Sequence, residues 1–463
     1  MKKLLAFLFF CFLNSSINAQ NNPISYSVEL NGATATKSTL PFWLYANQFG
    51  AVSNDHHIAA KLGVFSDFNT KDTAFKTSYK ASFIALKEAK NNSIVDELYA
   101  SAQYAIFQLD LGVKHPNLLW EGLSSSNGNI VMSTNARSLP GYNVSIPNYT
   151  QLPFAKNWLT FKGNYSDYMF TDNRIVTDAR LHAKSLYLKY KLNPTLELIT
   201  GINHYVQWGG TSSITGKQPS SFKDYLRIVT GSSGGHDALG NEEINVLGNH
   251  LGNYLLQLNY SGEKTNWNFY YSHIFEDGSG RELQNWRDGL YGVFIDFKQP
   301  KAFISHMLTE FTYTKHMSGS NAPDDANGGR GMDNYFNNGP AYNSGWTYFG
   351  NTIGSPYFTP TPLDDDGISH GIIDNRFMAF NIGMKGTIQQ LPYKLMLSHT
   401  TYFGWFNAEY QPKPTQFSGF LEFGLPKINQ FPIDITIGTA FDTGTYRPSN
   451  LGGFLKLTKR GVF

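Results

Sequence analysis

The chain has 463 residues, with 37 Lys and Arg against 35 Asp and Glu and a formal net charge of +2. This near balance of charge excludes the basic excess of a nucleic-acid-binding protein. Aromatic residues make up 15% of the chain and charged residues 16%, yet the mean hydropathy is only −0.31. Beyond the N-terminus no run of 18 apolar residues occurs, so a helical membrane protein is excluded as well.

Residues 1–19 have the pattern of a secretory signal peptide. Lys2 and Lys3 precede the apolar run LLAFLFFCFL, and a polar stretch then ends at Ala19, a small residue suited to cleavage. The apolar run is too short to span a membrane. We therefore expect export and a mature chain that begins at about Gln20.

The chain has one cysteine, Cys11, and it lies within this apolar run. We interpret it as part of the signal peptide rather than as a lipid anchor, because Phe10 precedes it where a small residue would be needed. Residues 20–463 are then expected to have neither disulfides nor thiolate metal sites.

Short segments that alternate between apolar and polar residues follow one another along the chain. In one of them Phe75, Tyr79 and Phe83 alternate with Lys76 and Lys80. A period of two gives a strand one dry face and one wet face. About 17 such segments are predicted, at 24–31, 57–68, 75–83, 95–105, 106–114, 156–169, 180–192, 195–208, 250–261, 266–276, 288–298, 303–317, 376–388, 393–405, 415–424, 431–442 and 451–463.

These segments predict an all-β fold, a transmembrane antiparallel β-barrel of about 16–18 strands with long ordered loops, since single-chain bacterial barrels usually have an even number of strands. Phe463 ends an alternating segment, and a terminal aromatic residue there resembles the assembly signal of outer-membrane barrels. We expect one barrel domain over 20–463, with a short non-strand segment near 31–55. In a barrel of this size the dry faces point to lipid and the polar faces line the lumen.

Three long insertions interrupt the strands, at 116–153, 211–249 and 318–375. Their Gly, Asn and Pro residues supply turns, and their aromatic residues argue against disorder. In the second insertion Ser221 is a candidate N-cap for a short helix that contains Phe222, Tyr225, Leu226 and Val229. Loops of this length in a compact protein usually carry function.

Several of these loops resemble a known family. The segments are LDLGVKHPNLLWEGLSSS (109–126), NARSLPGYNVSIPNYTQLPF (135–154), NHYVQWGG (203–210), SFKDYLRIVTGSSGG (221–235), NEEINVLGNHLGNY (241–254) and NNGPAYNSGWTYFGNTIGSP (337–356). They are similar, in this order, to the Bacteroidetes branch of the capsule assembly protein Wzi family.

The resemblance implies an outer-membrane barrel of about 18 strands that attaches or organises capsular or extracellular polysaccharide at the cell surface and is lectin-like rather than enzymatic. The partners that it implies are this polysaccharide, outer-membrane lipid and, during biogenesis, the barrel assembly machinery. We expect a monomer that does not bind nucleic acid. Family members from enteric bacteria carry a small periplasmic helical bundle. Residues 31–55 are too broken by Gly, Pro and Asn to predict one here.

Sugar-binding surfaces combine aromatic faces with planar polar side chains. The loop residues that fit as polysaccharide-binding candidates, including two arginines suited to acidic sugars, are Trp120, Arg137, Tyr142, Tyr149, Trp208, Arg330, Tyr342, Trp346, Tyr348 and Tyr357. The alternative for each aromatic residue is packing between loops or a place in an interfacial girdle.

No metal or other cofactor is predicted. Asp364, Asp365 and Asp366 are an acidic loop tip rather than a calcium loop, because their spacing does not match an EF-hand. No G-x-S-x-G, H-E-x-x-H or P-loop motif occurs, so no catalytic residues are assigned. The remaining alternative to a polysaccharide-binding protein is a porin or substrate channel, because barrels of 16 to 18 strands can enclose water.

Overall fold

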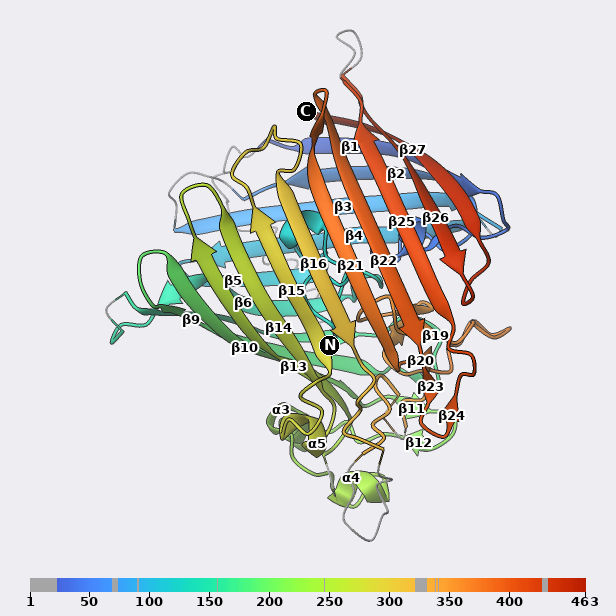
Figure 1. The fold of residues 1–463 in the computed structure, drawn as a ribbon. Coiled ribbons are helices and arrows are strands. Elements are labelled where there is room, and N and C mark those ends of the chain that lie inside the picture. The colour runs from blue at the N-terminus through green and yellow to red at the C-terminus, as the bar shows by residue number, and fades with distance from the viewer. Residues whose placement is uncertain are drawn as a thin grey trace.

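The computed structural model describes residues 23–68, 74–89, 91–155, 157–244, 246–320, 331–337, 339, 341–426 and 432–463. The predicted signal peptide and Arg330 lie outside them. The described chain forms one closed sheet of 18 antiparallel strands, in which the first strand pairs with both the second and the last (Figure 1). The predicted barrel is therefore confirmed.

The strands of the barrel are β1 (Ser25–Ala35), β2 (His57–Ser66), β3 (Phe75–Lys87), β4 (Asn92–Tyr104), β5 (Phe107–Val113), β6 (Gly141–Gln151), β7 (Leu159–Met169), β9 (Arg180–Lys191), β10 (Leu196–Trp208), β13 (Asn249–Ser261), β14 (Asn266–Phe275), β15 (Gly289–Asp296), β16 (His306–Tyr313), β21 (Phe377–Ile388), β22 (Leu391–Tyr402), β25 (Thr415–Gly424), β26 (Asp434–Gly444) and β27 (Asn450–Val462).

Short strands and helices lie in the connecting loops. They are α2 (Phe42–Tyr45), the 3-10 helix η1 (Trp120–Gly122), β8 (Val176–Thr177), β11 (Thr211–Ser212), β12 (Gly216–Lys217), α3 (Phe222–Thr230), α4 (Gly240–Ile244), α5 (Gly278–Arg281), β17 (Thr347–Tyr348), β18 (Asn351–Thr352), β19 (Thr359–Pro360), β20 (Ile372–Asp374), β23 (Gly404–Trp405) and β24 (Ala408–Glu409). None of the helices in the described part of the chain is long and apolar enough to span a bilayer.

Two sequence predictions need correction. Strand β6 lies inside the segment 116–153, which the sequence predicts to be a loop. Its alternation is broken where the register to β7 shifts between Ile146 and Thr150, and Pro147 falls in this shift, where a missing ladder N–H is tolerated. The non-strand segment expected near 31–55 spans 36–56, since β1 continues to Ala35.

The two ends of the barrel differ. Tight turns, such as the one through Gln389 and Gln390, lie at one end. The start of β1 and the end of β27 lie at this end too, where Ser25 pairs with Val462. All long connections lie at the other end, called here the long-loop end, at the bottom of Figure 1; they are 36–56, 114–140, 209–248, 276–288, 314–376 and 403–414. Outer-membrane barrels have short periplasmic turns and long extracellular loops, so the long-loop end is the extracellular one.

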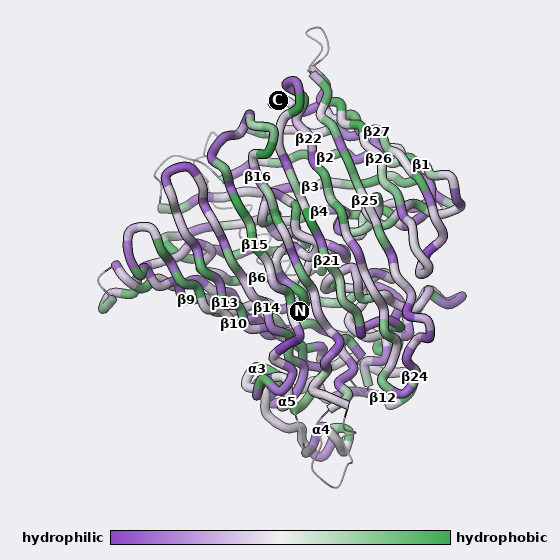
Figure 2. The backbone as a smooth tube through the Cα atoms, in the orientation of Figure 1, coloured by the Kyte–Doolittle hydropathy of each residue, from purple (hydrophilic) through white to green (hydrophobic). Residues whose placement is uncertain are grey.

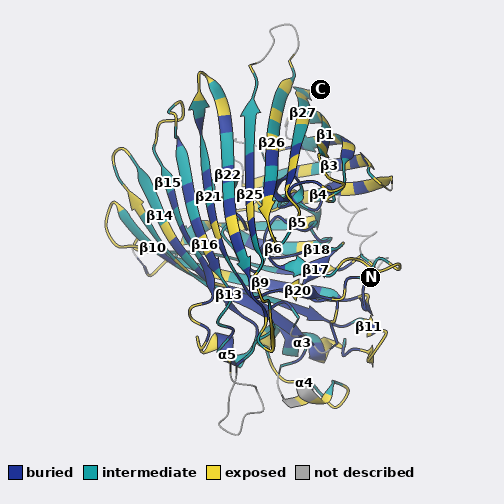
Figure 3. Ribbon diagram, turned by 45° about the vertical axis from the view of Figure 1, so that its right-hand side comes forward, coloured by how far each residue is buried: buried dark blue, intermediate teal, exposed yellow. Residues whose placement is uncertain are grey.

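Side chains along each strand alternate between the lumen and the outer surface. On β2, for example, Ile58, Leu62 and Val64 are exposed outward, whereas His57 and Ala59 are buried inside. Figures 2 and 3 show hydrophobic and exposed positions along the strands, and largely hydrophilic loops at the long-loop end. The outer surface is therefore the apolar belt that lipid requires.

Loops fill the lumen at the long-loop end. The plug comprises segments 36–56 and 114–140 and the described part of 331–376. Its Trp346 and Phe358 are fully buried in one apolar cluster with the inward-facing Leu181, Leu251 and Phe377 of the wall. Helix α2 packs on β25 and β26, and the indole N–H of its Trp43 donates to Ser398 Oγ of β22 at 3.1 Å.

One carboxylate on the inner wall fixes the plug. Glu310 on β16 is 1% exposed. Its Oε1 accepts hydrogen bonds from Ser124 Oγ and Tyr270 Oη, both at 2.6 Å. Its Oε2 accepts from the amide and the hydroxyl of Ser125, both at 2.7 Å, and from Asn381 Nδ2 at 3.4 Å. A buried carboxylate must have such partners, and here two of them come from the plug.

We predict that Glu310→Ala loosens the plug and leaves the barrel intact. The change leaves the buried donors of Ser124, Ser125 and Tyr270 without an acceptor, at a cost on the order of 3 kcal/mol or more. Limited proteolysis of the folded protein in detergent should then cut 114–140 faster than in wild type. Glu29→Ala, which removes a half-buried lumen carboxylate, is the matched control, and equal protease resistance in both variants would contradict the prediction.

Candidate functional site

Four predicted sugar-binding aromatics belong to the core of the plug. Tyr342, Trp346, Tyr348 and Tyr357 are all buried in the main apolar cluster. Tyr357 stacks on Phe42 with ring centroids 5.6 Å apart. These rings present no face to a polymer outside, so in this structure they pack the plug, which was the alternative for each of them.

The other described candidates are dispersed. Trp120 lies in the lumen, where it stacks on Tyr270 at 5.0 Å. The ring of Tyr149 has the ammonium groups of Lys162 and Lys189 over it at 4.9 and 4.7 Å.

Two further candidates, Tyr142 and Trp208, lie on the outside of the wall. The hydroxyl of Tyr142 donates to Asp167 at 2.6 Å, and Trp208 is buried beneath helix α3. The structure therefore does not bring the predicted set together.

Arg137 differs from the other described candidates, because it lies at the long-loop end of the plug. Its guanidinium lies over the ring of Phe349 at 4.2 Å, and its Nε donates to Gly50 O at 3.2 Å. Burial lowers the pKa of Arg137, while the charges of Glu88 and Asp172 and the nearby Tyr348 oppose this shift. Phe349 as a whole residue is 37% exposed.

An open groove lies between the β3–β4 turn and the segment before β2, three residues beyond Gly50, to which Arg137 donates. It has a volume of about 460 Å³ and is lined by Ser53, Asp55, Glu88, Ala89, Asn91 and Asn92. Glu88 links the two parts, since it accepts a hydrogen bond from the amide of Ser53 at 2.9 Å and its charge acts on Arg137. We call the groove together with Arg137 and Phe349 the rim site.

The rim site has the chemistry of a sugar-binding surface. Carboxylate and amide groups suit hydroxyls, a guanidinium suits acidic groups, and an exposed ring suits C–H faces. Sequence reasoning found only Arg137 of this set. Glu88 and Asn91 lie in the four-residue β3–β4 turn and Asn92 begins β4, a stretch that carries no motif, and only the fold brings it next to 53–55.

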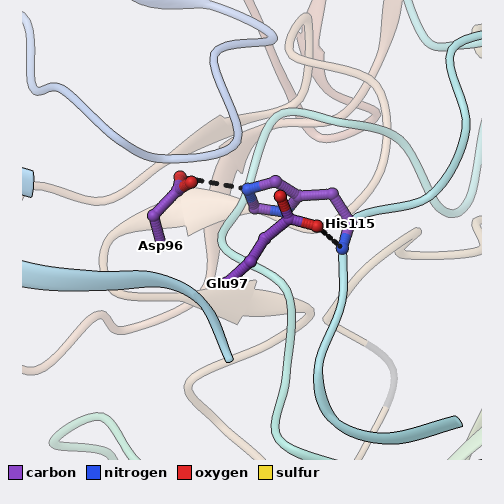
Figure 4. A group of neighbouring side chains, drawn as sticks. All are labelled: Asp96, Glu97 and His115. Atoms are coloured by element: carbon purple, nitrogen blue, oxygen red, sulfur yellow. Dashed lines mark hydrogen bonds and ion pairs between the residues drawn. The ribbon is translucent and has the colours of Figure 1, made fainter. Parts of the chain in front are cut away.

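A cluster of two carboxylates and a histidine lies deeper in the lumen (Figure 4). Asp96 and Glu97 both turn inward because β4 has a bulge, in which Asp96 has no partner opposite it on β3. His115 Nε2 lies 3.1 Å from Asp96 Oδ1, and the amide of His115 donates to Glu97 Oε1 at 3.1 Å.

Lysines already neutralise this cluster. Lys61 Nζ lies 2.7 Å from Asp96 Oδ2, and Lys80 Nζ lies 2.5 Å from Glu97 Oε2. A cation would have to displace these ammonium groups. Since His115 also bonds Ser138 of the plug at 2.8 Å, we interpret the cluster as an anchor between plug and wall.

The acidic loop tip predicted at 364–366 is a hydrogen-bonded turn. Asp364 Oδ1 accepts from the amides of Asp366 and Ile368 at 3.0 and 2.9 Å, and its Oδ2 lies 2.7 Å from His370 Nε2. These hydrogen bonds lower the pKa of Asp364. Its oxygens are thus engaged within the turn.

A second acidic group joins two long loops near α5. Asp277 caps α5, and Asp333 accepts hydrogen bonds from Ser279 Oγ at 3.3 Å and Ser318 Oγ at 2.6 Å. Burial, and next the charge of Asp277, raise the pKa of Asp333 to about 7.

We predict that these loops lose stability as the pH rises. The folded pKa of Asp333 lies above the unfolded value of about 3.9, so the folded state binds the proton more tightly and stability falls between about pH 4 and pH 7. Amide protection factors of 331–337 should therefore be higher at pH 5 than at pH 8. Protection factors convert to free energies of local opening. Asp333→Asn should reduce the difference between these free energies at pH 5 and pH 8 by about 2 to 3 kcal/mol, at about 1.4 kcal/mol per pKa unit. If the difference is unchanged in Asp333→Asn, the carboxyl group is not responsible.

A closed antiparallel barrel with an apolar belt, short turns at one end and long loops at the other is an outer-membrane β-barrel, here with a lumen that its own loops fill. The family model of the capsule assembly protein Wzi matches residues 19–361, and the chain belongs to this family. The predicted family is thus confirmed, whereas the branch within it stays a prediction.

Solved structures share the fold. Wzi of Escherichia coli, described as an outer membrane protein involved in group 1 capsule assembly and as a carbohydrate-binding β-barrel, is 12% identical, with 98% of this chain and 88% of that chain covered and a TM-score of 0.56. OccK3 (OpdO) of Pseudomonas aeruginosa is 10% identical, with 96% of each chain covered and a TM-score of 0.49. No curated protein sequence matches this chain.

Proposed function

We propose that this protein is a non-enzymatic outer-membrane barrel that binds capsular or extracellular polysaccharide and holds it at the cell surface. The observation that carries the proposal is membership of the capsule assembly family over residues 19–361. The carbohydrate binding described for the E. coli protein of the same fold supports it.

The binding surface that we propose is the rim site. It opens at the extracellular end, whereas most of the aromatic candidates predicted from sequence are buried or face the lumen or the outer wall. A polymer lying in the groove would meet Glu88, Asn91 and Asn92. Beyond the groove it would reach Arg137 and Phe349 of the plug, where Arg137 bonds Gly50. We infer that an acidic repeat unit would pair with Arg137 through its guanidinium.

We predict that purified protein binds the polysaccharide of the producing strain and that Arg137→Ala and Phe349→Ala each weaken this binding by about tenfold, or about 1.4 kcal/mol, because each removes a contact of that size. Surface plasmon resonance on immobilised polysaccharide measures it. Trp405→Ala, at another exposed aromatic residue of the long-loop end, is the matched control. Binding that does not distinguish the rim variants from this control would remove the rim site from the proposal.

The channel alternative makes a different prediction. The plug and the wall form one apolar cluster across the lumen, and the polar cavity beside it, about 240 Å³ in volume, is bounded by Leu44 and Phe49 of the plug. We therefore predict almost no ion conductance for wild-type protein in a planar bilayer, although an 18-stranded porin conducts readily. Regular open-channel steps at neutral pH would favour a substrate channel instead.

A further inference from the structure

Helix α3 packs against the outside of the barrel wall rather than over its mouth. Ser221 caps it with a capping box, as its sequence predicts, and its inner side carries Tyr225 and Ile228. The hydroxyl of Tyr225 donates to Asp167 Oδ2 on β7 at 2.7 Å. Ile228 is fully buried against Val206 and Trp208 of β10.

The alternation along β10 shows that these wall residues point outward. Gln207, between them, points into the lumen, where its Nε2 donates to Gly345 O of the plug at 3.0 Å. Val206 and Trp208 therefore share the outer face with Ile202, which is exposed. The lipid-facing side of β10 is thus bare at Ile202 and covered by α3 only a few residues further along.

The side of α3 that faces away from the wall is apolar and basic. Phe222 and Leu226, one turn apart, are 75% and 49% exposed, and the exposed Lys223 lies beside them. On the neighbouring strands Leu186 and Leu256 are exposed outward as well. Phe222 and Leu226 therefore extend the apolar belt of the barrel along the helix.

Three basic residues belong to this region: Lys223 on α3, Lys217 five residues before the helix, and Arg180 on β9. Among the described residues no carboxylate pairs with Lys217, Lys223 or Arg180, and the guanidinium of Arg180 lies over the ring of Trp208 at 4.9 Å. By contrast, Arg227 pairs with Asp224 within the helix at 2.8 Å. Unpaired cations beside an exposed apolar surface are the groups with which interfacial helices meet lipid phosphates.

We propose that α3 is a docking element for the outer leaflet of the membrane. Phe222 and Leu226 enter the acyl boundary of the leaflet, and Lys217, Lys223 and Arg180 bind the phosphate groups of its lipids, as interfacial amphipathic helices do. The helix thereby fixes the loop 209–248 at the membrane surface. This proposal does not depend on polysaccharide binding.

Site-directed spin labelling tests the proposal in the full barrel. Cys11, the only cysteine, lies in the predicted signal peptide, so residues 20–463 are a cysteine-free background for Phe222→Cys and Leu226→Cys. After reconstitution into bilayers that contain an anionic phospholipid, collisions with oxygen and with a water-soluble nickel complex report the surroundings of each label. Leu256→Cys, 52% exposed on the lipid face, and Leu363→Cys, 48% exposed in the plug, are the lipid and water controls.

We expect labels at 222 and 226 to behave as at 256, with a several-fold higher ratio of oxygen to nickel collisions than at 363. Adding Lys217→Gln and Lys223→Gln should lower this ratio in anionic bilayers and leave it unchanged in zwitterionic ones. If labels at 222 and 226 give the same ratio as the label at 363, the proposal is wrong. If the ratio is as high as at 256 but does not change in anionic bilayers on Lys217→Gln and Lys223→Gln, the proposed phosphate contacts are wrong.

Discussion

The hydrogen bonds to Glu310 are the interaction on which the rest of the structure depends. A barrel of 18 strands is too wide for its own inward side chains to fill, so water or loops must occupy the lumen, and in this chain loops enter it and bond to its wall. Glu310 is a buried carboxyl group, and Ser124 and Ser125 of the plug supply three of its hydrogen bonds. The buried carboxyl group of the wall therefore depends on the plug for hydrogen bonds, and the same bonds hold the plug in the lumen.

The same constraint divides the aromatic residues of the chain. Those in the plug, such as Trp346 and Phe358, replace the water that an empty barrel would hold, and they make one apolar cluster with the wall. Those on the outer face meet lipid. In the plug, Phe349 at the extracellular edge stays partly open to solvent, so the part of the plug that we propose to meet a polymer lies at the rim.

The barrel was predictable because a period of two marks a strand that has lipid on one side and polar groups on the other. Strand β6 was missed because Pro147 and a register shift interrupt that period. The helix at Ser221 was predictable because its cap is local in sequence. The rim site was not, since burial of Trp346 and the approach of Glu88 to Arg137 arise from contacts between distant segments, which composition does not encode.

Capsule retention in cells tests the central claim most directly. A strain that lacks this protein, the same strain with the wild-type chain restored, and the parent are compared for polysaccharide on cells and in the culture supernatant. If the protein holds polysaccharide at the surface, the deletion moves polysaccharide from cells to medium while total synthesis stays constant, and the restored chain reverses this. Unchanged retention in the deletion strain would contradict the account.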